Sequence, residues 1–220
     1  MLVEAKGPRW LFDIPKTRAL LVVAHSDDET IFAGGLILLS HETHWTVICC
    51  TSESNQRNLE FLCACEFLGK ESNNKVDPVL LGLIPDNIDH SALNKELRSY
   101  VTGYDIVFTH NNQGEYGHED HKVVQRCVTD SIANPNTWVF ISPGSTNVNQ
   151  EQLKSKKPGG NFLLHLPLNV VILKKTAFQK CHKSQAELYG YHNDKLRDTD
   201  LRETLLWEFE SGKEEYAFYK

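Results

Sequence analysis

The chain has 220 residues, of which 40% are hydrophobic, 24% charged and 10% aromatic, as in ordinary globular proteins with a sizeable core. Lys and Arg total 23 against 29 Asp and Glu, and this net charge of −6 argues against a nucleic-acid-binding surface. No stretch approaches the roughly 18 apolar residues of a membrane helix, and the N-terminus lacks a signal-peptide layout. We therefore expect a cytoplasmic protein whose single domain spans residues 1–220.

The first predicted element is a buried strand at residues 19–24, whose branched apolar residues suit a parallel sheet covered on both faces. Asp27, Asp28 and Glu29 follow it directly, before apolar residues at roughly helical spacing. Because acidic side chains stabilise the first turn of a helix, we expect a helix to begin here. His25 and Asp28 therefore lie at the carboxyl end of a strand, where open α/β sheets bind their ligands.

Strands and helices then alternate along the chain. Strands are expected at residues 45–50, 79–83, 105–110, 137–141 and 168–173, and helices at residues 55–68, 91–100, 118–133 and 176–189. This alternation predicts a Rossmann-like, doubly wound α/β fold, in which a mostly parallel sheet carries helices on both faces. Gly69 is expected to end the second helix, and Ser91 to cap the third.

Two segments depart from this alternation. Residues 142–160 are rich in Ser, Asn, Gln, Lys, Pro and Gly, and we interpret them as a mobile loop within the domain. Residues 201–220 are expected to form a partly amphipathic helix followed by a short acidic and aromatic tail.

The six cysteines include no C-x-x-C pair and no other zinc-site spacing. Cys49, Cys50, Cys63 and Cys65 lie in apolar segments, where cysteine behaves as a small hydrophobic residue. We therefore expect the cysteines to be reduced and not catalytic.

A second polar cluster, at residues 114–121, follows the fourth predicted strand and so lies at the same edge of the sheet as His25. Its two histidines, His118 and His121, are three residues apart and can face a common centre. A catalytic zinc site usually takes three ligands from His, Asp or Glu and keeps one position for water. His25, Asp28 and one of the paired histidines meet that requirement.

Other polar side chains of the two clusters suit a hydrolytic reaction. A divalent ion lowers the pKa of bound water and polarises a carbonyl group, but a carboxylate must still accept the proton of the water. Asp27 is the candidate base, and the second histidine could protonate a leaving group. Asp120 could orient that histidine or a ligand through its other ring nitrogen. The simpler alternatives are that the acids only cap a helix and that the histidines lie on the surface.

The two motifs together resemble the PIG-L or LmbE-like family of zinc-dependent N-acetylglucosaminyl deacetylases. Residues 25–29 are His-Ser-Asp-Asp-Glu, and residues 117–121 are Gly-His-Glu-Asp-His. The family patterns are Ala-His-Pro-Asp-Asp-Glu and His-x-Asp-His. Ser26 replaces the proline without removing a ligand, and the segment 51–57 is shorter than the glycine-containing loop usual in the family. Substrate size and orientation therefore stay open.

This resemblance implies roles for individual residues. Zn²⁺, or another divalent metal, would be held by His25, Asp28 and His121. Asp27 would be the general base, and His118 either the general acid or an oxyanion-stabilising group.

The resemblance also covers residues outside the two motifs. Tyr116 would help to polarise the acetyl carbonyl, while Arg57 and Asp86 would contact sugar hydroxyls. Residues 182–185 resemble a family segment near the C-terminus, for which we favour a structural role over contact with substrate.

The leading hypothesis is a metal-dependent hydrolase that removes the N-acetyl group from an N-acetylglucosamine-type amino sugar or its conjugate. Its partner would be this small molecule, with no nucleic acid and no membrane span. The oligomeric state stays open, with a homo-oligomer as one alternative. The rival functions are an amidase acting on a different sugar conjugate and a non-catalytic sugar-binding or regulatory protein. A nucleotide-binding module is disfavoured because no glycine-rich phosphate loop follows the first strand.

Overall fold

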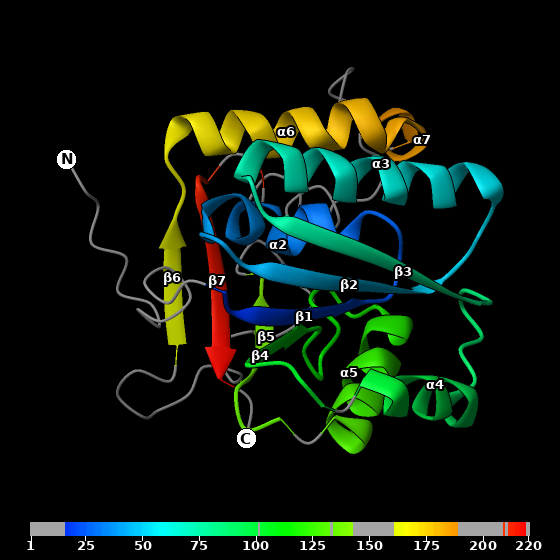
Figure 1. Cartoon of the computed structure of the whole chain (residues 1–220). Helices are drawn as coiled ribbons and strands as arrows, with labels where there is room; N and C mark the ends of the chain where they lie inside the picture. Colours follow the sequence, from blue (N-terminus) through cyan, green and yellow to red (C-terminus); the bar gives the residue numbers. More distant parts are fainter. Residues whose placement is uncertain are drawn as a thin grey trace.

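A seven-stranded sheet lies at the centre of the computed structural model, which describes residues 16–100, 102–132, 134–142, 161–188, 209 and 211–218. Within these residues the strand order is β3-β2-β1-β4-β5-β7-β6 (Figure 1). The strands are β1 (Arg18–Val23), β2 (His44–Thr51), β3 (Lys75–Leu83), β4 (Ile106–Thr109), β5 (Thr137–Ile141), β6 (Asn161–His165) and β7 (Lys213–Phe218). Strands β1 to β5 pair in parallel, whereas β7 runs antiparallel to both β5 and β6.

Helices cover both faces of this sheet (Figure 1). They are α2 (Asp28–Leu39), α3 (Asn55–Ser72), α4 (His90–Leu97), α5 (Glu119–Ser131), α6 (Leu168–Cys181) and α7 (Lys183–Leu188), with a 3₁₀ turn at Arg98–Tyr100. Helices α2, α3 and α6 pack against one another on one face, and α4 packs against α5 on the other. The predicted doubly wound, mostly parallel α/β fold is confirmed. No helix within the described ranges combines the length and the apolar character needed to cross a membrane.

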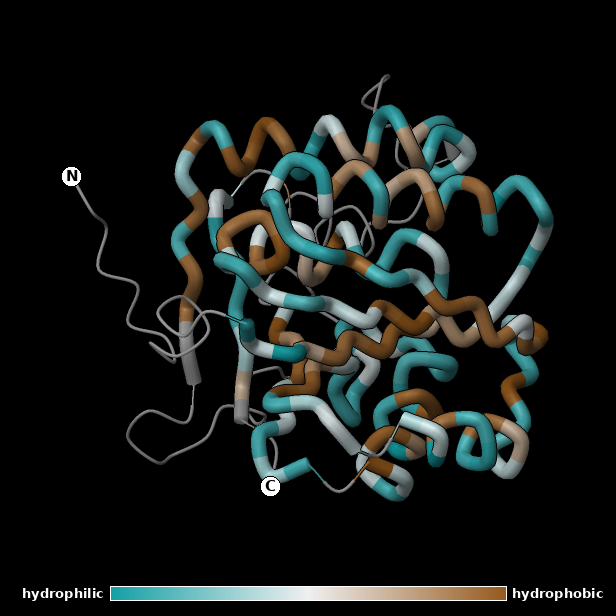
Figure 2. The backbone as a smooth tube through the Cα atoms, in the orientation of Figure 1, coloured by the Kyte–Doolittle hydropathy of each residue, from teal (hydrophilic) through white to brown (hydrophobic). Residues whose placement is uncertain are grey.

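The burial of β1 explains its apolar sequence. Its residues alternate between two cores: Leu21 belongs to the core beneath α2 and α3, and Leu20 to the core beneath α4 and α5. Leu21 also lies in register with Val47 of β2 and Phe108 of β4. Figure 2 shows that the central strands are hydrophobic along most of their length. A strand buried on both faces needs this continuous apolar run.

The prediction of a strand at residues 168–173 is wrong, because these residues form the first turns of α6. The buried residues of the helix, Val170, Lys174, Ala177 and Phe178, recur at helical spacing. A buried lysine interrupts that apolar pattern in the sequence, so the branched residues before it resemble a strand.

The prediction of a helix and a tail at residues 201–220 is also wrong in part. Lys213–Phe218 forms strand β7, and of the remaining residues in 201–220 only 209, 211 and 212 are described. Residues 143–160 of the expected mobile loop lie outside the described ranges as well.

Two helix ends differ from their predicted positions. Helix α3 continues past Gly69 to Ser72 and ends at Asn73, which has the left-handed conformation (φ 57°). Helix α4 is capped by Asp89, whose side chain accepts the Ala92 N–H, and not by Ser91.

Cys63 and Cys181 form a disulfide that joins α3 to the end of α6, so the expectation of reduced cysteines is wrong for this pair. Cys63 is exposed and Cys181 is buried. The partners are 118 positions apart, a pairing that no local spacing reveals. Cys49, Cys50, Cys65 and Cys127 are free and buried, as expected for small core residues.

A buried carboxylate holds the middle of α2. Glu214 of β7 accepts the backbone N–H groups of Gly35 and Leu36 at 2.7 and 2.8 Å, and its Oε1 lies 2.7 Å from Lys174 Nζ of α6. Tyr216 Oη lies 2.8 Å from the same carboxylate. Since a buried charge is costly unless it is paired and hydrogen-bonded, these contacts fix α2 against α6 and β7.

We predict that Gly35→Ala destabilises the protein by about 1–3 kcal/mol, the usual cost of overpacking a core. A Cβ atom at Gly35 would lie 2.5 Å from Leu166 Cδ2 and 2.8 Å from Glu214 Oε1. Gly34→Ala is the matched control, because its nearest neighbour is the flexible Lys174 side chain at 3.2 Å. Urea unfolding of both variants measures the difference, and equal midpoints would contradict the assignment.

Candidate active site

A pocket of about 400 Å³ opens at the carboxyl ends of the parallel strands, within the volume range of small-molecule sites. The loops that follow β1, β2, β3 and β4 contribute to its wall, together with α2, α3 and α7. Its lining residues are His25, Asp27, Asp28, Ile31, Phe32, Glu53, Arg57, Pro85, Asp86, Tyr116, His118 and Gln185. Seven of the nine predicted site residues therefore line one pocket, and the other two, Asp120 and His121, are buried behind it.

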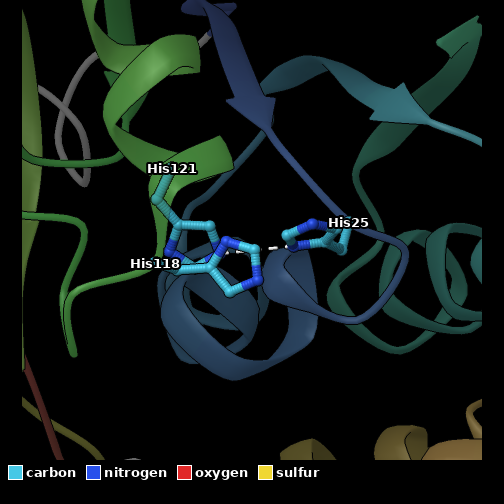
Figure 3. Close-up of side chains that lie close together, drawn as sticks. All are labelled: His25, His118 and His121. Carbon is cyan, nitrogen blue, oxygen red and sulfur yellow. Dashed lines mark hydrogen bonds between the residues drawn. The ribbon is translucent and has the colours of Figure 1, made fainter. Parts of the chain in front are cut away.

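Three side-chain atoms converge on one point beside this pocket. His25 Nδ1 lies 3.4 Å from Asp28 Oδ2, and His121 Nε2 lies 3.5 Å from the same oxygen. The two nitrogens are 3.3 Å apart, and Figure 3 shows the two histidine rings facing each other. Tetrahedral zinc with bonds of roughly 2.0–2.1 Å separates its ligand atoms by roughly 3.3–3.4 Å. The triangle therefore has the dimensions of one face of a zinc coordination sphere.

Two carboxylates orient the histidine rings of this triangle. Asp120 Oδ2 lies 3.0 Å from His25 Nε2, and Glu115 Oε2 lies 2.6 Å from His121 Nδ1. A carboxylate accepts the proton of the ring nitrogen that faces it, so the opposite nitrogen of each ring is the one that could bind an ion at the common point. Burial and the neighbouring His110 lower the pKa of His121 to about 4, which keeps that ring neutral near pH 7.

His110 and Glu115 are site residues that the sequence interpretation missed. His110, fully buried after β4, accepts the Ala24 N–H through Nε2 at 3.0 Å and faces Glu115 Oε2 with Nδ1 at 2.8 Å. Glu115 also accepts the Asn111 N–H at 2.8 Å. A histidine directly after a buried strand was the signal that singled out His25, and the same signal was present at His110.

The described residues contain two further groups of three side chains that could hold a metal ion. Asp28, His110 and His121 have ligand atoms within 4.8 Å of one another, and so do His25, His118 and His121. The Nε2 lone pair of His110 is already used by the Ala24 N–H, so His110 is better suited to supporting the site than to binding an ion.

Asp27 is a buried carboxylate on the pocket wall, at the N-terminus of α2. Its Oδ2 lies 3.4 Å from Arg57 Nη2, and the Arg57 side chain also lies 3.4 Å from Glu53. Burial raises the pKa of Asp27, while the Arg57 guanidinium opposes this rise. The group therefore combines access to the pocket with the stronger basicity of a desolvated carboxylate.

His118 caps the N-terminus of α5 with its ring. Its Nδ1 accepts the Asp120 N–H at 3.2 Å, so the neutral ring carries its proton on Nε2. Burial and the nearby His25 lower the pKa of His118. The Tyr116 ring lies 5.9 Å from the His118 ring, on the same part of the pocket wall.

Asp86 lines the pocket, and its backbone also supports the site. Its N–H donates to Asp120 Oδ2 at 2.8 Å, and its φ of 59° belongs to the left-handed region. The carboxylate that orients His25 thus also fixes the loop that follows β3.

Glu29 and residues 182–185 meet behind the pocket. Glu29 Oε1 lies 2.7 Å from His182 Nε2 and 2.6 Å from Thr30 Oγ1, and neither Glu29 nor His182 is exposed. This contact supports the structural role favoured for residues 182–185. Gln185, however, lines the pocket.

Several solved structures share this fold. The zinc-inhibited form of teicoplanin deacetylase Orf2 matches with a TM-score of 0.61 and 13% identity, covering 91% of this chain and 97% of that one. N,N′-diacetylchitobiose deacetylase from Pyrococcus horikoshii matches at 0.57 and 20%, covering 80% and 73%. The 4-carboxy-2-hydroxymuconate hydratase GalB from Pseudomonas putida KT2440 matches at 0.57 and 21%, covering 80% and 82%. At these identities the likeness concerns the fold alone.

Comparison of the sequence with known proteins and families identifies the family. The uncharacterized protein L374 of Acanthamoeba polyphaga mimivirus is 31% identical over an alignment of 149 residues. The match covers 60% of this chain and 64% of the relative, just under two thirds of its length. The model of the PIG-L family, described as GlcNAc-PI de-N-acetylase, matches residues 20–132, just over half of the chain, and includes both polar clusters. The chain therefore belongs to the PIG-L family of de-N-acetylases.

Proposed function

We propose that this protein is a zinc-dependent hydrolase that removes the N-acetyl group from an N-acetylglucosamine-type amino sugar or its conjugate. Membership of a family of de-N-acetylases supports the hydrolysis of an amide. The observation that carries the zinc assignment is the triangle of His25 Nδ1, Asp28 Oδ2 and His121 Nε2, with sides of 3.3 to 3.5 Å. Two imidazoles and one carboxylate are a common ligand set of catalytic zinc.

The bound metal ion would lower the pKa of a water molecule and polarise the acetyl carbonyl. His25, Asp28 and His121 would hold it, and Asp120 and Glu115 fix the ring orientations of the two histidines. Zn²⁺ suits this set of imidazole and carboxylate ligands, and other divalent metals remain alternatives.

Asp27 is the general base in this proposal. The carboxylate lines the pocket beside the ligand Asp28, and Arg57 holds its Oδ2. Asp27 takes a proton from the attacking water as the C–O bond forms. It then returns this proton to the amine nitrogen as the C–N bond breaks, so that acetate and a free amine leave.

His118 stabilises the developing oxyanion in this proposal, and the alternative role of general acid is less favoured. Its Nδ1 is occupied by the Asp120 N–H, so the neutral ring directs only its Nε2–H to a ligand. The lowered pKa of His118 also favours the neutral ring. Tyr116, on the same part of the wall, assists in polarising the carbonyl.

Arg57 and Asp86 are proposed to contact sugar hydroxyls, supported by their positions in the pocket wall. Both also hold a group of the site, because Arg57 pairs with Asp27 and the Asp86 N–H binds Asp120. Loss of either residue therefore affects catalysis as well as substrate binding.

The rival function is a non-catalytic sugar-binding protein on the same fold. The metal triangle and a buried base in one pocket argue against this alternative, because neither is needed to bind a sugar. Saturable sugar binding without release of acetate would favour it. An amidase acting on another sugar conjugate would be separated by a substrate panel that reports free amine.

A cytoplasmic location stays a prediction from the sequence. The Cys63–Cys181 disulfide is the observation against it, because reducing compartments keep such pairs as thiols. Alkylation of free thiols in intact cells, followed by mass analysis, distinguishes the Cys63–Cys181 disulfide from two free thiols.

Replacing Glu115, whose carboxylate orients the His121 ring, tests the metal site without an activity assay. We predict that Glu115→Gln weakens zinc affinity by about 10–100-fold, the usual effect of losing a carboxylate behind a ligand. Competition with a chromophoric chelator measures this affinity, and circular dichroism checks the fold. Glu119→Gln, which changes an exposed acid four residues away, is the control. Equal affinities in the two variants would remove Glu115 from the zinc site.

The base assignment predicts that Asp27→Asn keeps its zinc but loses about 10²–10⁴-fold in kcat, because no carboxylate remains to accept the proton. Amine release from an N-acetylglucosaminide gives the rate, and metal analysis gives the occupancy. Asp130→Asn on the exposed side of α5 should leave both unchanged. Full activity of Asp27→Asn would rule out this base.

The two roles left open for His118 make different predictions. A neutral donor can be replaced in part by an amide N–H, so His118→Gln should retain at least about tenfold more activity than His118→Ala, the worth of one well-placed donor. A general acid would be lost equally in both variants, because glutamine does not supply a proton at neutral pH. Initial rates of acetate release decide between these outcomes.

A further inference from the structure

Helix α7 lies at the pocket and is fixed to two other helices. The Ser184 N–H and Oγ donate to the Glu60 carboxylate of α3 at 2.9 and 2.6 Å. Just before the helix, His182 Nε2 lies 2.7 Å from Glu29 of α2, and the preceding Cys181 is bonded to Cys63. A short helix that is marginal by itself is thus held by a buried imidazole–carboxylate contact, two hydrogen bonds and a disulfide.

Gln185 is the residue that this arrangement presents to the pocket. It is 7% exposed and lines the pocket together with Asp27 and Arg57. Among the described residues its amide makes one side-chain hydrogen bond, from Nε2 to Ser184 Oγ at 3.3 Å. A primary amide offers two N–H donors and a carbonyl acceptor, so it retains capacity for a ligand.

The origin of Gln185 separates it from Tyr116 and His118. Tyr116 and His118 come from the loop before α5, on one face of the sheet, whereas α7 lies beside α3 and α6 on the other (Figure 1). Gln185 thus enters the pocket from the face opposite to that of the two groups proposed to polarise the acetyl carbonyl.

We propose that Gln185 is a substrate-binding and specificity-determining residue, whose amide hydrogen-bonds a ring hydroxyl of the amino sugar. This inference rests on the proposed function and names a further contact of the same site. A rigidly held polar group rejects analogues that lack its partner, because it is then left buried without a hydrogen bond. The contacts that fix α7 supply this rigidity.

The test compares Gln185→Ala with wild type on an N-acetylglucosaminide and on its 3-deoxy, 4-deoxy and 6-deoxy analogues. We expect about a 5–10-fold lower kcat/KM on the parent sugar, mostly through a higher KM, as for a lost binding contact. On one deoxy analogue the variant and wild type should be equal, because the hydroxyl that Gln185 contacts is missing there. A merely structural role would not produce this dependence on a single hydroxyl.

Two further variants keep the test decisive. Gln185→Met preserves length without the amide and replaces the alanine variant if melting shows that alanine perturbs α7. Glu187→Ala, at an exposed position on the same helix, should match wild type on every substrate.

The outcomes separate this inference from the proposed function. An equal loss on all four sugars, or no loss on any, overturns the role of Gln185 and leaves the deacetylase intact. Wild-type protein that folds and binds zinc but releases no amine from any of these amides overturns the proposed function, and the inference with it.

Discussion

The buried carboxylate of Glu115 accepts hydrogen bonds from two imidazoles and a backbone N–H, and the geometry of the site depends on it. A buried carboxylate is stable only when hydrogen-bond donors replace the water molecules that it has lost. His110, His121 and Asn111 supply these donors to Glu115, which is fully buried. In return, the carboxylate fixes both rings in the tautomer that carries the proton on Nδ1. The lone pair of His121 is thereby aimed at His25 and Asp28.

The loop that carries Glu115 needs glycine for this arrangement. Gly114 has a φ of +69°, and a Cβ atom there would lie 2.3 Å from the backbone oxygen of His118. Glu115 itself has a φ of 46°, a conformation that most side chains disfavour. The backbone strain of this loop is therefore offset by the hydrogen bonds that Glu115 makes.

The proposed catalytic side chains and the groups that support them come from different parts of the chain. Residues 20–132, which match the PIG-L family, contain all the proposed ligands and the base. The groups that hold α2 in place, His182 against Glu29 and the Lys174–Glu214 pair, come from beyond that segment. Helix α2 begins with Asp28, so its alignment with His121 depends on the C-terminal elements.

The sequence allowed the parts encoded within short segments to be predicted. His25, Asp27 and Asp28 occupy one strand-to-helix turn, and His118 to His121 occupy one helical turn. Each motif can therefore be recognised from a few neighbouring residues of the sequence. The α/β alternation followed from apolar runs in the same way. Local patterns are sufficient for such features because one stretch of backbone fixes all their members.

Features that depend on distant partners could not be predicted in this way. Lys174 is buried because Glu214 lies beside it. A lysine at a buried position interrupts the apolar pattern of α6, so the helix is not recognised from the sequence alone. Cys63 and Cys181 meet only once α3 and α6 have packed together. His110 follows a buried strand just as His25 does, but its supporting role became evident only from its contacts with Glu115 and with the N–H of Ala24, 86 positions earlier.

The position of β7 between β5 and β6 sets an order of assembly during synthesis. Among the described strands, β6 pairs with β7 alone, so it cannot join the sheet until residues 213–218 have left the ribosome. Glu214 arrives in the same segment, and with it the carboxylate that clamps the middle of α2. A nascent chain can thus form β1 and its neighbours early, yet α2, which carries the proposed ligand Asp28, is held fully only after residues 213–218 have been synthesised.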